Sequence, residues 1–121
     1  MSVNAALWAV QIFLAAVFAS SGIAKLTMSK PRMIATGQTG VAPFPLPVIR
    51  LTAACEVLAA IGLILPGLLH VAPLLTPLAA VGLMVVMVGA GISHRSLHEY
   101  PQVGLNLFLF LLALFVAVGR T

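Results

Sequence analysis

The segment "RLTAACEVLAAIGLIL", residues 50–65, carries one carboxylate, Glu56, inside a run that is otherwise almost entirely apolar or small. A run of this kind predicts a helix that crosses a membrane. The chain has only one other acid, Glu99, and that residue lies among polar neighbours. Because an unpaired charge in hydrocarbon is costly, Glu56 is expected to face the interior of a helix bundle and to have a partner there.

The composition of the whole chain supports a membrane protein. Of 121 residues, 62% are hydrophobic and 7% are charged, whereas soluble domains carry roughly 25% charged residues. The six Lys and Arg residues are scattered and form no basic stripe with interleaved aromatics, which argues against a nucleic-acid partner. The single cysteine, Cys55, excludes an internal disulfide and a CxxC motif. It is expected to be a small core residue.

Four apolar runs are separated by turn signals, and the lipid bilayer is their expected environment. The second run is expected to end at Pro66-Gly67. The first has no basic residue before Trp8 and a long apolar core, which favours a membrane span over a cleaved signal peptide. The prediction is an all-α polytopic membrane protein, an antiparallel bundle of four transmembrane helices in one domain over residues 1–121. The helices are expected at residues 5–26, 48–65, 73–93 and 103–118.

The first connection, "TMSKPRMIATGQTGVAPFPLP" at residues 27–47, is long and rich in Gly and Pro. It cannot continue a helix, and its apolar but irregular second half, "GVAPFPLP" at residues 40–47, is predicted to lie along the membrane interface. If the four helices alternate, Arg120 falls on one side of the membrane and the other five cations on the opposite side. Since Lys and Arg gather in cytoplasmic loops, the first and third loops are predicted to be cytoplasmic and both termini extracytoplasmic. The five cations are Lys25, Lys30, Arg32, Arg50 and Arg95.

Helical periodicity places most of the unusual polar residues on stripes that can face one another. Gln11, Ser21 and Lys25 share a stripe with Leu14 and Phe18 in the first helix. Thr52 and Glu56 share a face in the second, and Met87, Ala90 and His94 share one in the third. Gln102, Asn106 and Phe110 share a face in the fourth. Four of these residues can converge in the cytoplasmic half of the bundle, where they are candidate ligand-binding residues: Lys25, Glu56, His94 and Asn106.

Each candidate also has a structural interpretation. Glu56 either binds a ligand or relays a proton, or it only pairs with Lys25 or with a hydroxyl and Asn106. Lys25 either contacts a ligand or is a snorkelling anchor at the interface. His94 is a proton shuttle, a metal ligand or a hydrogen-bonded residue at a helix end. No metal site is predicted, because Glu56 and one His are too few ligands, and no catalytic residue is assigned.

Three segments together resemble the DoxX-like family of small four-helix bacterial membrane proteins. They are "SSGIAKL" at residues 20–26, "CEVLAAIGLILPGLLHVAPLLTPLAAVGLMVVMVGAGISH" at residues 55–94 and "LNLFLFLLALFVAVGR" at residues 105–120. The resemblance implies a bacterial inner-membrane location. It also implies links to a thiosulfate:quinone oxidoreductase, to quinone or oxidative-stress resistance and to membrane redox assemblies. The family positions that it implies are Gly22, Lys25, Glu56, His94 and Asn106.

The resulting hypothesis is a membrane protein without catalytic activity of its own. It would bind a quinone or another lipid-like molecule, or act as an accessory subunit beside redox partner proteins. One alternative is a proton-coupled exporter, although small multidrug transporters carry their acid in the first helix and act as antiparallel dimers. Another is a purely structural subunit of a membrane complex. The ligand-binding hypothesis predicts an apolar cavity ending at Glu56, the exporter a polar chamber between two copies, and the structural subunit a solid bundle. The oligomeric state is left open.

Overall fold

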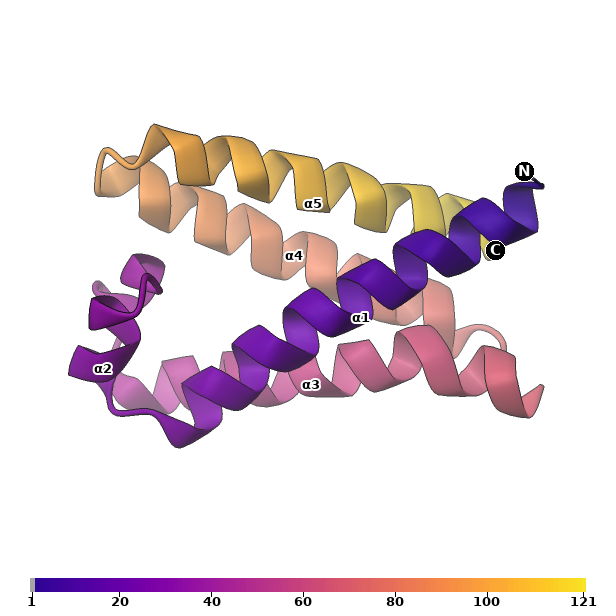
Figure 1. Cartoon of the computed structure of the whole chain (residues 1–121), viewed down its shortest axis with the longest axis horizontal. Helices are drawn as coiled ribbons and strands as arrows, with labels where there is room; N and C mark the ends of the chain where they lie inside the picture. Colours follow the sequence, from indigo (N-terminus) through magenta and orange to yellow (C-terminus); the bar gives the residue numbers. More distant parts are fainter. Residues whose placement is uncertain (1) are drawn as a thin grey trace.

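The structure, a computed structural model, describes residues 2–121 and is built from helices (Figure 1). Within the described residues, four helices are long and apolar enough to cross a membrane. Two shorter elements, α2 (Lys30–Ala35) and the 3-10 helix η1 (Thr39–Val41), lie in the connection between the first and second long helices. The long helices are α1 (Val3–Thr27), α3 (Leu46–Leu69), α4 (Leu75–Ser96) and α5 (Tyr100–Gly119).

The four long helices run up and down in sequence order, so that both termini lie at the end opposite α2 (Figure 1). Helix α1 packs against α3, α3 against α4, and α4 against α5, and α5 contacts α1 again. This arrangement confirms the predicted all-α membrane bundle of four helices.

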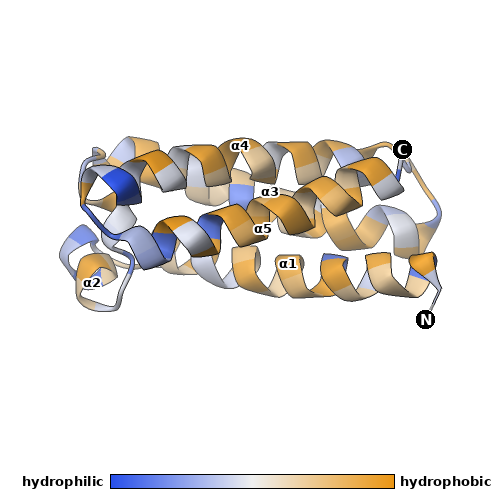
Figure 2. Cartoon of the chain, turned by 90° about the horizontal axis from the view of Figure 1, so that it is seen from above, coloured by the Kyte–Doolittle hydropathy of each residue, from blue (hydrophilic) through white to orange (hydrophobic). Residues whose placement is uncertain are grey.

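The molecule is apolar on the outside as well as in its core. Leu14, Leu63 and Leu83 are fully buried between the helices. On the outer faces, Leu51 and Val85 are each 68% exposed. Apolar residues cover all four long helices, and hydrophilic residues gather most clearly at the end that carries α2 (Figure 2). Because a soluble monomer rarely exposes such continuous apolar surface, these faces are the ones that contact lipid.

Two glycines show how α1 crosses the bundle. At the α2 end, a Cβ on Gly22 would lie 2.8 Å from the backbone oxygen of Ala53, so α1 and α3 are in direct contact there. At the opposite end, a Cβ on Gly119 would lie 2.6 Å from Leu7, so α1 touches α5 there. Helix α1 therefore runs obliquely from α5 towards α3 (Figure 1), and the two helices α1 and α5 diverge near α2.

The prediction that the second helix ends at Pro66 is wrong, because α3 continues through Pro66 to Leu69. Proline has no N–H and therefore leaves the carbonyl four residues earlier, that of Gly62, without its helical donor. The Thr76 hydroxyl of α4 donates to this Gly62 oxygen at 2.8 Å. In the next position, Gln11 of α1 donates through Nε2 to the oxygen of Leu63 at 2.6 Å. The Thr76 hydroxyl of the neighbouring helix α4 thus supplies the hydrogen bond that Pro66 removes from α3.

The other boundaries differ from the expectation mainly at the α2 end. Helix α4 runs three residues further than expected, so His94 lies inside its last turn. Helix α5 begins at Tyr100 with Pro101 in its first turn, where a missing N–H is harmless. The first connection, expected not to continue a helix, contains α2, which starts after Ser29, whose hydroxyl accepts from the Arg32 N–H.

Cys55, expected in the core, is exposed on the outer face of α3. It borders an apolar groove of about 540 Å³ between α3 and α4. The expectation failed because α3 is apolar on all sides, so the residue types around Cys55 do not distinguish its inner face from its lipid face.

A polar cluster closes the bundle at the end that carries the termini. Arg120 donates through Nε to Gln11 Oε1 at 2.7 Å and through Nη1 to Asn4 Oδ1 at 2.9 Å. Its guanidinium also lies 5.5 Å from the ring centre of Trp8, a cation–π contact. Because Gln11 also bonds α3, this cluster holds the end of α5 to α1 and α3.

Candidate functional site

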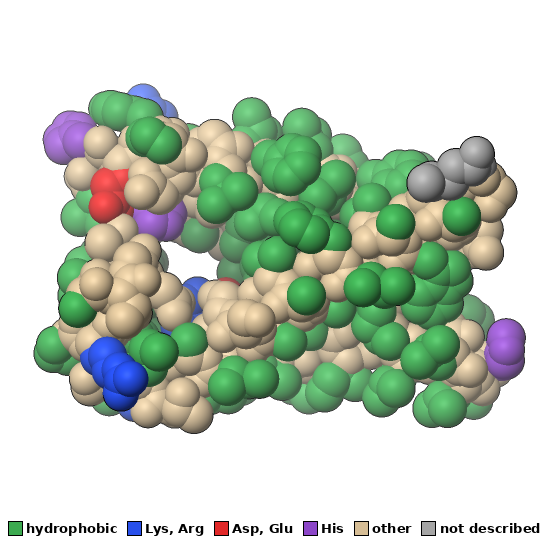
Figure 3. All heavy atoms as spheres, viewed as in Figure 1, with side chains coloured by type: hydrophobic (Ala, Val, Ile, Leu, Met, Phe, Trp, Pro, Cys, Tyr) green, Lys and Arg blue, Asp and Glu red, His purple; other side chains and the backbone are tan. Residues whose placement is uncertain are grey.

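A cavity of about 520 Å³ lies where α1 and α5 diverge. Its walls come from all four long helices, and the connection between α1 and α3 forms its roof. The space-filling view shows the molecule hollowed at this end, with basic and acidic side chains at the edge of the opening (Figure 3). All four candidate residues line this one cavity: Lys25, Glu56, His94 and Asn106.

An ion pair between α1 and α3 forms the polar part of the wall. Lys25 Nζ lies 3.0 Å from Glu56 Oε1. The Glu56 side chain is 1% exposed and that of Lys25 is 18% exposed. Gly22, one turn before Lys25, brings the two helices together, and Arg50 donates to the Lys25 carbonyl oxygen at 2.6 Å. Lys25 is thus held over Glu56. This agrees with the prediction that Glu56 faces the interior of the bundle and has a partner there.

The same cavity contains polar atoms without partners. Within residues 2–121, Glu56 Oε2, Asn106 Nδ2 and Gln38 Oε1 are buried and make no hydrogen bond. All three residues line the cavity. Ser21 lies beside the Glu56 carboxyl on the same wall, but its hydroxyl is outside hydrogen-bonding geometry. Because buried polar groups in proteins are nearly always paired, such a cluster indicates a place where a ligand or water completes the bonding.

Apart from Thr52, His94 and Gln102, the rest of the wall is apolar. Phe18 and Val17 contribute from α1, Val86 and Met87 from α4, and Leu109 from α5. Phe44, Val48 and Ile49 close the side below the roof. The cavity therefore combines a short polar wall with a longer apolar one, the usual composition of a site for a small molecule.

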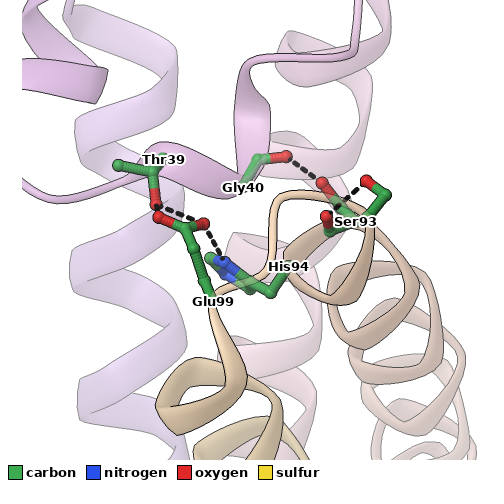
Figure 4. A network of polar contacts seen from close by, with 6 residues as sticks. Thr39, Gly40, Ser93, His94 and Glu99 are labelled. Atoms are coloured by element: carbon green, nitrogen blue, oxygen red, sulfur yellow. Dashed lines mark hydrogen bonds and ion pairs between the residues drawn. The ribbon is translucent and has the colours of Figure 1, made fainter.

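The roof is fastened to the turn between α4 and α5 by a polar network, here called the latch and formed by Thr39, Gly40, Ser93, His94 and Glu99 (Figure 4). The Thr39 hydroxyl lies 2.8 and 2.7 Å from the two oxygens of Glu99. His94 Nδ1 lies 2.9 Å from Glu99 Oε1. The Ser93 hydroxyl donates to the Gly40 oxygen at 2.6 Å. These contacts hold η1 over the cavity.

One glycine in the latch and one just before it have a structural reason. A Cβ on Gly40 would lie 2.8 Å from His94 Nε2, so a larger residue there would push the ring from its present position. Gly37 has φ of 104°, a left-handed conformation that favours glycine and that turns the chain before Gln38. The pKa of Glu99 is lowered from its ordinary value of 4.5 by the hydrogen bond from Thr39 and then by the contact with His94.

The structure therefore separates the candidates into two groups. Lys25 and Glu56 pair directly, and Asn106 shares their cavity without a partner for its amide nitrogen. His94 also lines the cavity but pairs with Glu99, outside the predicted cluster. Within residues 2–121, no three His, Cys, Asp or Glu side chains group as metal ligands. The ligand-binding roles of the four residues stay a prediction.

Sequence reasoning missed the residues of the roof. Gln38 and Thr39 lie in a connection whose composition predicts irregular structure, and Glu99 has the surroundings of an ordinary polar turn residue. One feature of the sequence could have pointed to Glu99. It is one of only two acids in the chain, and it follows His94 by five residues. No local pattern joins Glu99 to Thr39, because they are sixty residues apart.

Comparison with known families gives one result. Residues 9–116 match the DoxX-like family. The chain belongs to the DoxX-like family. The matched range includes the four long helices almost in full, the cavity-lining candidates and the whole latch, so the cavity lies within the DoxX-like part of the chain. No curated protein and no solved structure matches. The chain is thus a DoxX-like multi-pass membrane protein.

Proposed function

We propose that this DoxX-like protein binds a small amphipathic, lipid-like molecule in the cavity, with a quinone or its reduced form as the first candidate. The observation that carries the proposal is the pair of buried, unpartnered atoms, Glu56 Oε2 and Asn106 Nδ2, of residues that line a mostly apolar cavity. The chain assists by binding and orienting the molecule, and any redox chemistry belongs to a partner protein.

Size and polarity support this class of ligand. A volume of about 520 Å³ lies within the range of roughly 300–1,000 Å³ that small-molecule sites have. The head of the ligand would meet Lys25, Glu56 and Asn106, and its apolar body would lie against Phe18, Met87 and the other apolar side chains of the wall. A molecule with a polar ring and a short tail fits this division, whereas a highly charged metabolite does not.

The other hypotheses make different demands on the molecule. A purely structural subunit needs no internal space, so the cavity favours ligand binding over it. An exporter of the small multidrug type needs a chamber between two copies, whereas this cavity is formed by one chain. A role as accessory subunit of a membrane redox system is compatible with binding, since the subunit would hold the quinone for its partner.

The proposed setting is the bacterial inner membrane with the α2 end in the cytoplasm. Five of the six Lys and Arg residues belong to that end and Arg120 to the other, the distribution expected for cytoplasmic loops. Alkaline phosphatase fused after Thr121 should then be active. An inactive phosphatase together with a fluorescent C-terminal green fluorescent protein would reverse the assignment.

The test of binding is a titration of purified protein with a short-chain quinone. Wild type should bind saturably, and Glu56→Ala and Lys25→Ala should each weaken binding by roughly tenfold or more, which corresponds to about 1.4 kcal/mol. Leu51→Ala, on the lipid face of α3, is the matched control and should bind as wild type does. Absence of saturable binding, or unchanged binding by both cavity variants, would overturn the proposal.

A further inference from the structure

We infer that the cavity selects a head group bearing a hydrogen-bond donor, so that it takes a hydroxylated ring, a quinol or phenol, in preference to an oxidised quinone or an O-methylated ring. The inference rests on the proposed function and adds the chemical class of the ligand. Its basis is a set of hydrogen-bonding atoms in the cavity wall that have no hydrogen-bond partner.

The first unmatched atom is Glu56 Oε2. Lys25 Nζ lies 3.0 Å from the other oxygen of the same carboxylate and forms an ion pair with it. An ionised carboxylate only accepts hydrogen bonds. Glu56 Oε2 therefore needs a donor, and among the described residues no donor, including the neighbouring Ser21 hydroxyl, is in hydrogen-bonding geometry with it.

The other unmatched atoms come from different elements. Asn106 Nδ2, on α5, is a donor without an acceptor, and Gln38 Oε1, in the roof, is an acceptor without a donor among residues 2–121. Asn106 is 8% exposed and Glu56 is 1% exposed, so bulk water reaches neither freely. These buried atoms are two acceptors and one donor, in a wall that also contains the Lys25 ammonium group and the side chains of Ser21 and Thr52.

A quinone matches this set poorly. Its carbonyl oxygens accept hydrogen bonds and can satisfy Asn106, but they donate nothing to Glu56 or Gln38. An oxygen lone pair placed against a carboxylate oxygen is repelled. A hydroxyl can donate and accept, so a quinol or phenol can serve both kinds of atom. Since a buried polar group left unpaired weakens binding, the hydroxylated head should bind more tightly.

Two ligands that differ only in whether the ring oxygen carries a hydrogen or a methyl group test the inference without redox chemistry. Purified protein in detergent is titrated with 4-butylphenol, with 4-butylanisole, its O-methyl counterpart, and with a butyl-substituted benzoquinone, against empty micelles as the blank. Wild type should bind the phenol roughly tenfold or more tightly than the other two, in line with the strength of a hydrogen bond to a charged group. Glu56→Gln, whose amide can both donate and accept, should bring the ratio close to one.

The outcomes separate the two proposals. If the anisole or the quinone binds as tightly as the phenol, and Glu56→Ala weakens that binding, the donor requirement is wrong and the proposed function stands. If the phenol is preferred but Glu56→Gln keeps the preference, the assignment to Glu56 is wrong. If none of the three ligands binds wild type, the proposed function fails and the inference fails with it. The comparison of ligands on wild type needs no variant, so poor folding of Glu56→Gln does not prevent the test.

Discussion

Lys25 Nζ and Glu56 Oε1 lie 3.0 Å apart across the contact between α1 and α3, and the second oxygen of Glu56 has no hydrogen-bond partner among residues 2–121. The first relationship explains how an acid is tolerated inside an apolar helix. The second shows that Lys25 alone does not complete the bonding of the carboxylate. Glu56 therefore has both a structural and a binding role available to it, and variants can separate them.

Substitution of one residue of the ion pair should lower the stability of the protein more than substitution of both. Lys25→Met leaves a buried charge alone, and the free energy of unfolding should fall by about 3 kcal/mol. The double variant Lys25→Met/Glu56→Leu should recover most of this loss, because a buried pair is often replaceable by apolar residues. Unfolding by SDS in mixed micelles measures the stability of the single and of the double variant. If the double variant is as unstable as the single one, the pair does more for the fold than this argument allows.

The same double variant distinguishes stability from function. It should fold well and yet bind neither a short-chain quinone nor an alkylphenol, since the ion pair that would meet the head group is gone. If this stable variant bound as tightly as wild type, the ion pair would not be part of the binding site.

Gly22→Ala should destabilise the bundle, and Gly82→Ala should not. A Cβ at position 22 would lie 2.8 Å from the backbone oxygen of Ala53, which cannot move easily, and overpacking of this kind costs about 1–3 kcal/mol. A Cβ at position 82 meets nothing within 4 Å, so alanine there gains helix propensity of up to about 1 kcal/mol. Thermal unfolding of the two variants in one detergent makes the comparison. Equal effects would contradict the close contact of α1 and α3.

Thr76→Val should matter only while residue 66 is proline. In wild type, loss of the bond to the Gly62 oxygen should cost about 1 kcal/mol, a typical size for a hydrogen bond between membrane helices. In a Pro66→Ala background the new backbone N–H can bond the Gly62 oxygen itself, so the same substitution should cost close to nothing. A double-mutant cycle measured by unfolding in detergent gives the coupling. Equal costs in the two backgrounds would show that Thr76 does not replace the bond that Pro66 removes.

The latch should make stability depend on acid. Because the folded state lowers the pKa of Glu99 below 4.5, the contribution of Glu99 is fully present above that pH and is lost as the pH falls through the lower, folded value. His94 of α4 is a titratable group that faces Glu99. The difference in melting temperature between wild type and Glu99→Gln should therefore shrink on acidification. A difference that is constant with pH would contradict this role of Glu99.

Much of the bundle could be predicted because apolar runs identify membrane helices directly. Lys25, Glu56 and Asn106 could be placed on one side of the bundle because polar residues in a span are few and have helical spacing. The continuation of α3 through Pro66 could not be predicted, since the hydrogen bonds from Thr76 and Gln11 come from other helices. The latch was missed for the same reason, since the contact of Thr39 with Glu99 exists only after the chain has folded.

The most direct test of the central claim is native mass spectrometry of the protein released from lipid nanodiscs made from its own membrane. Wild type is predicted to retain one small molecule that is not a phospholipid and that carries a ring hydroxyl or its oxidised form. Glu56→Ala should lose this molecule, and Leu51→Ala should keep it. A wild-type spectrum with only apoprotein and phospholipid adducts, or the same adduct in undiminished amount on Glu56→Ala, would contradict the claim that this cavity is a binding site.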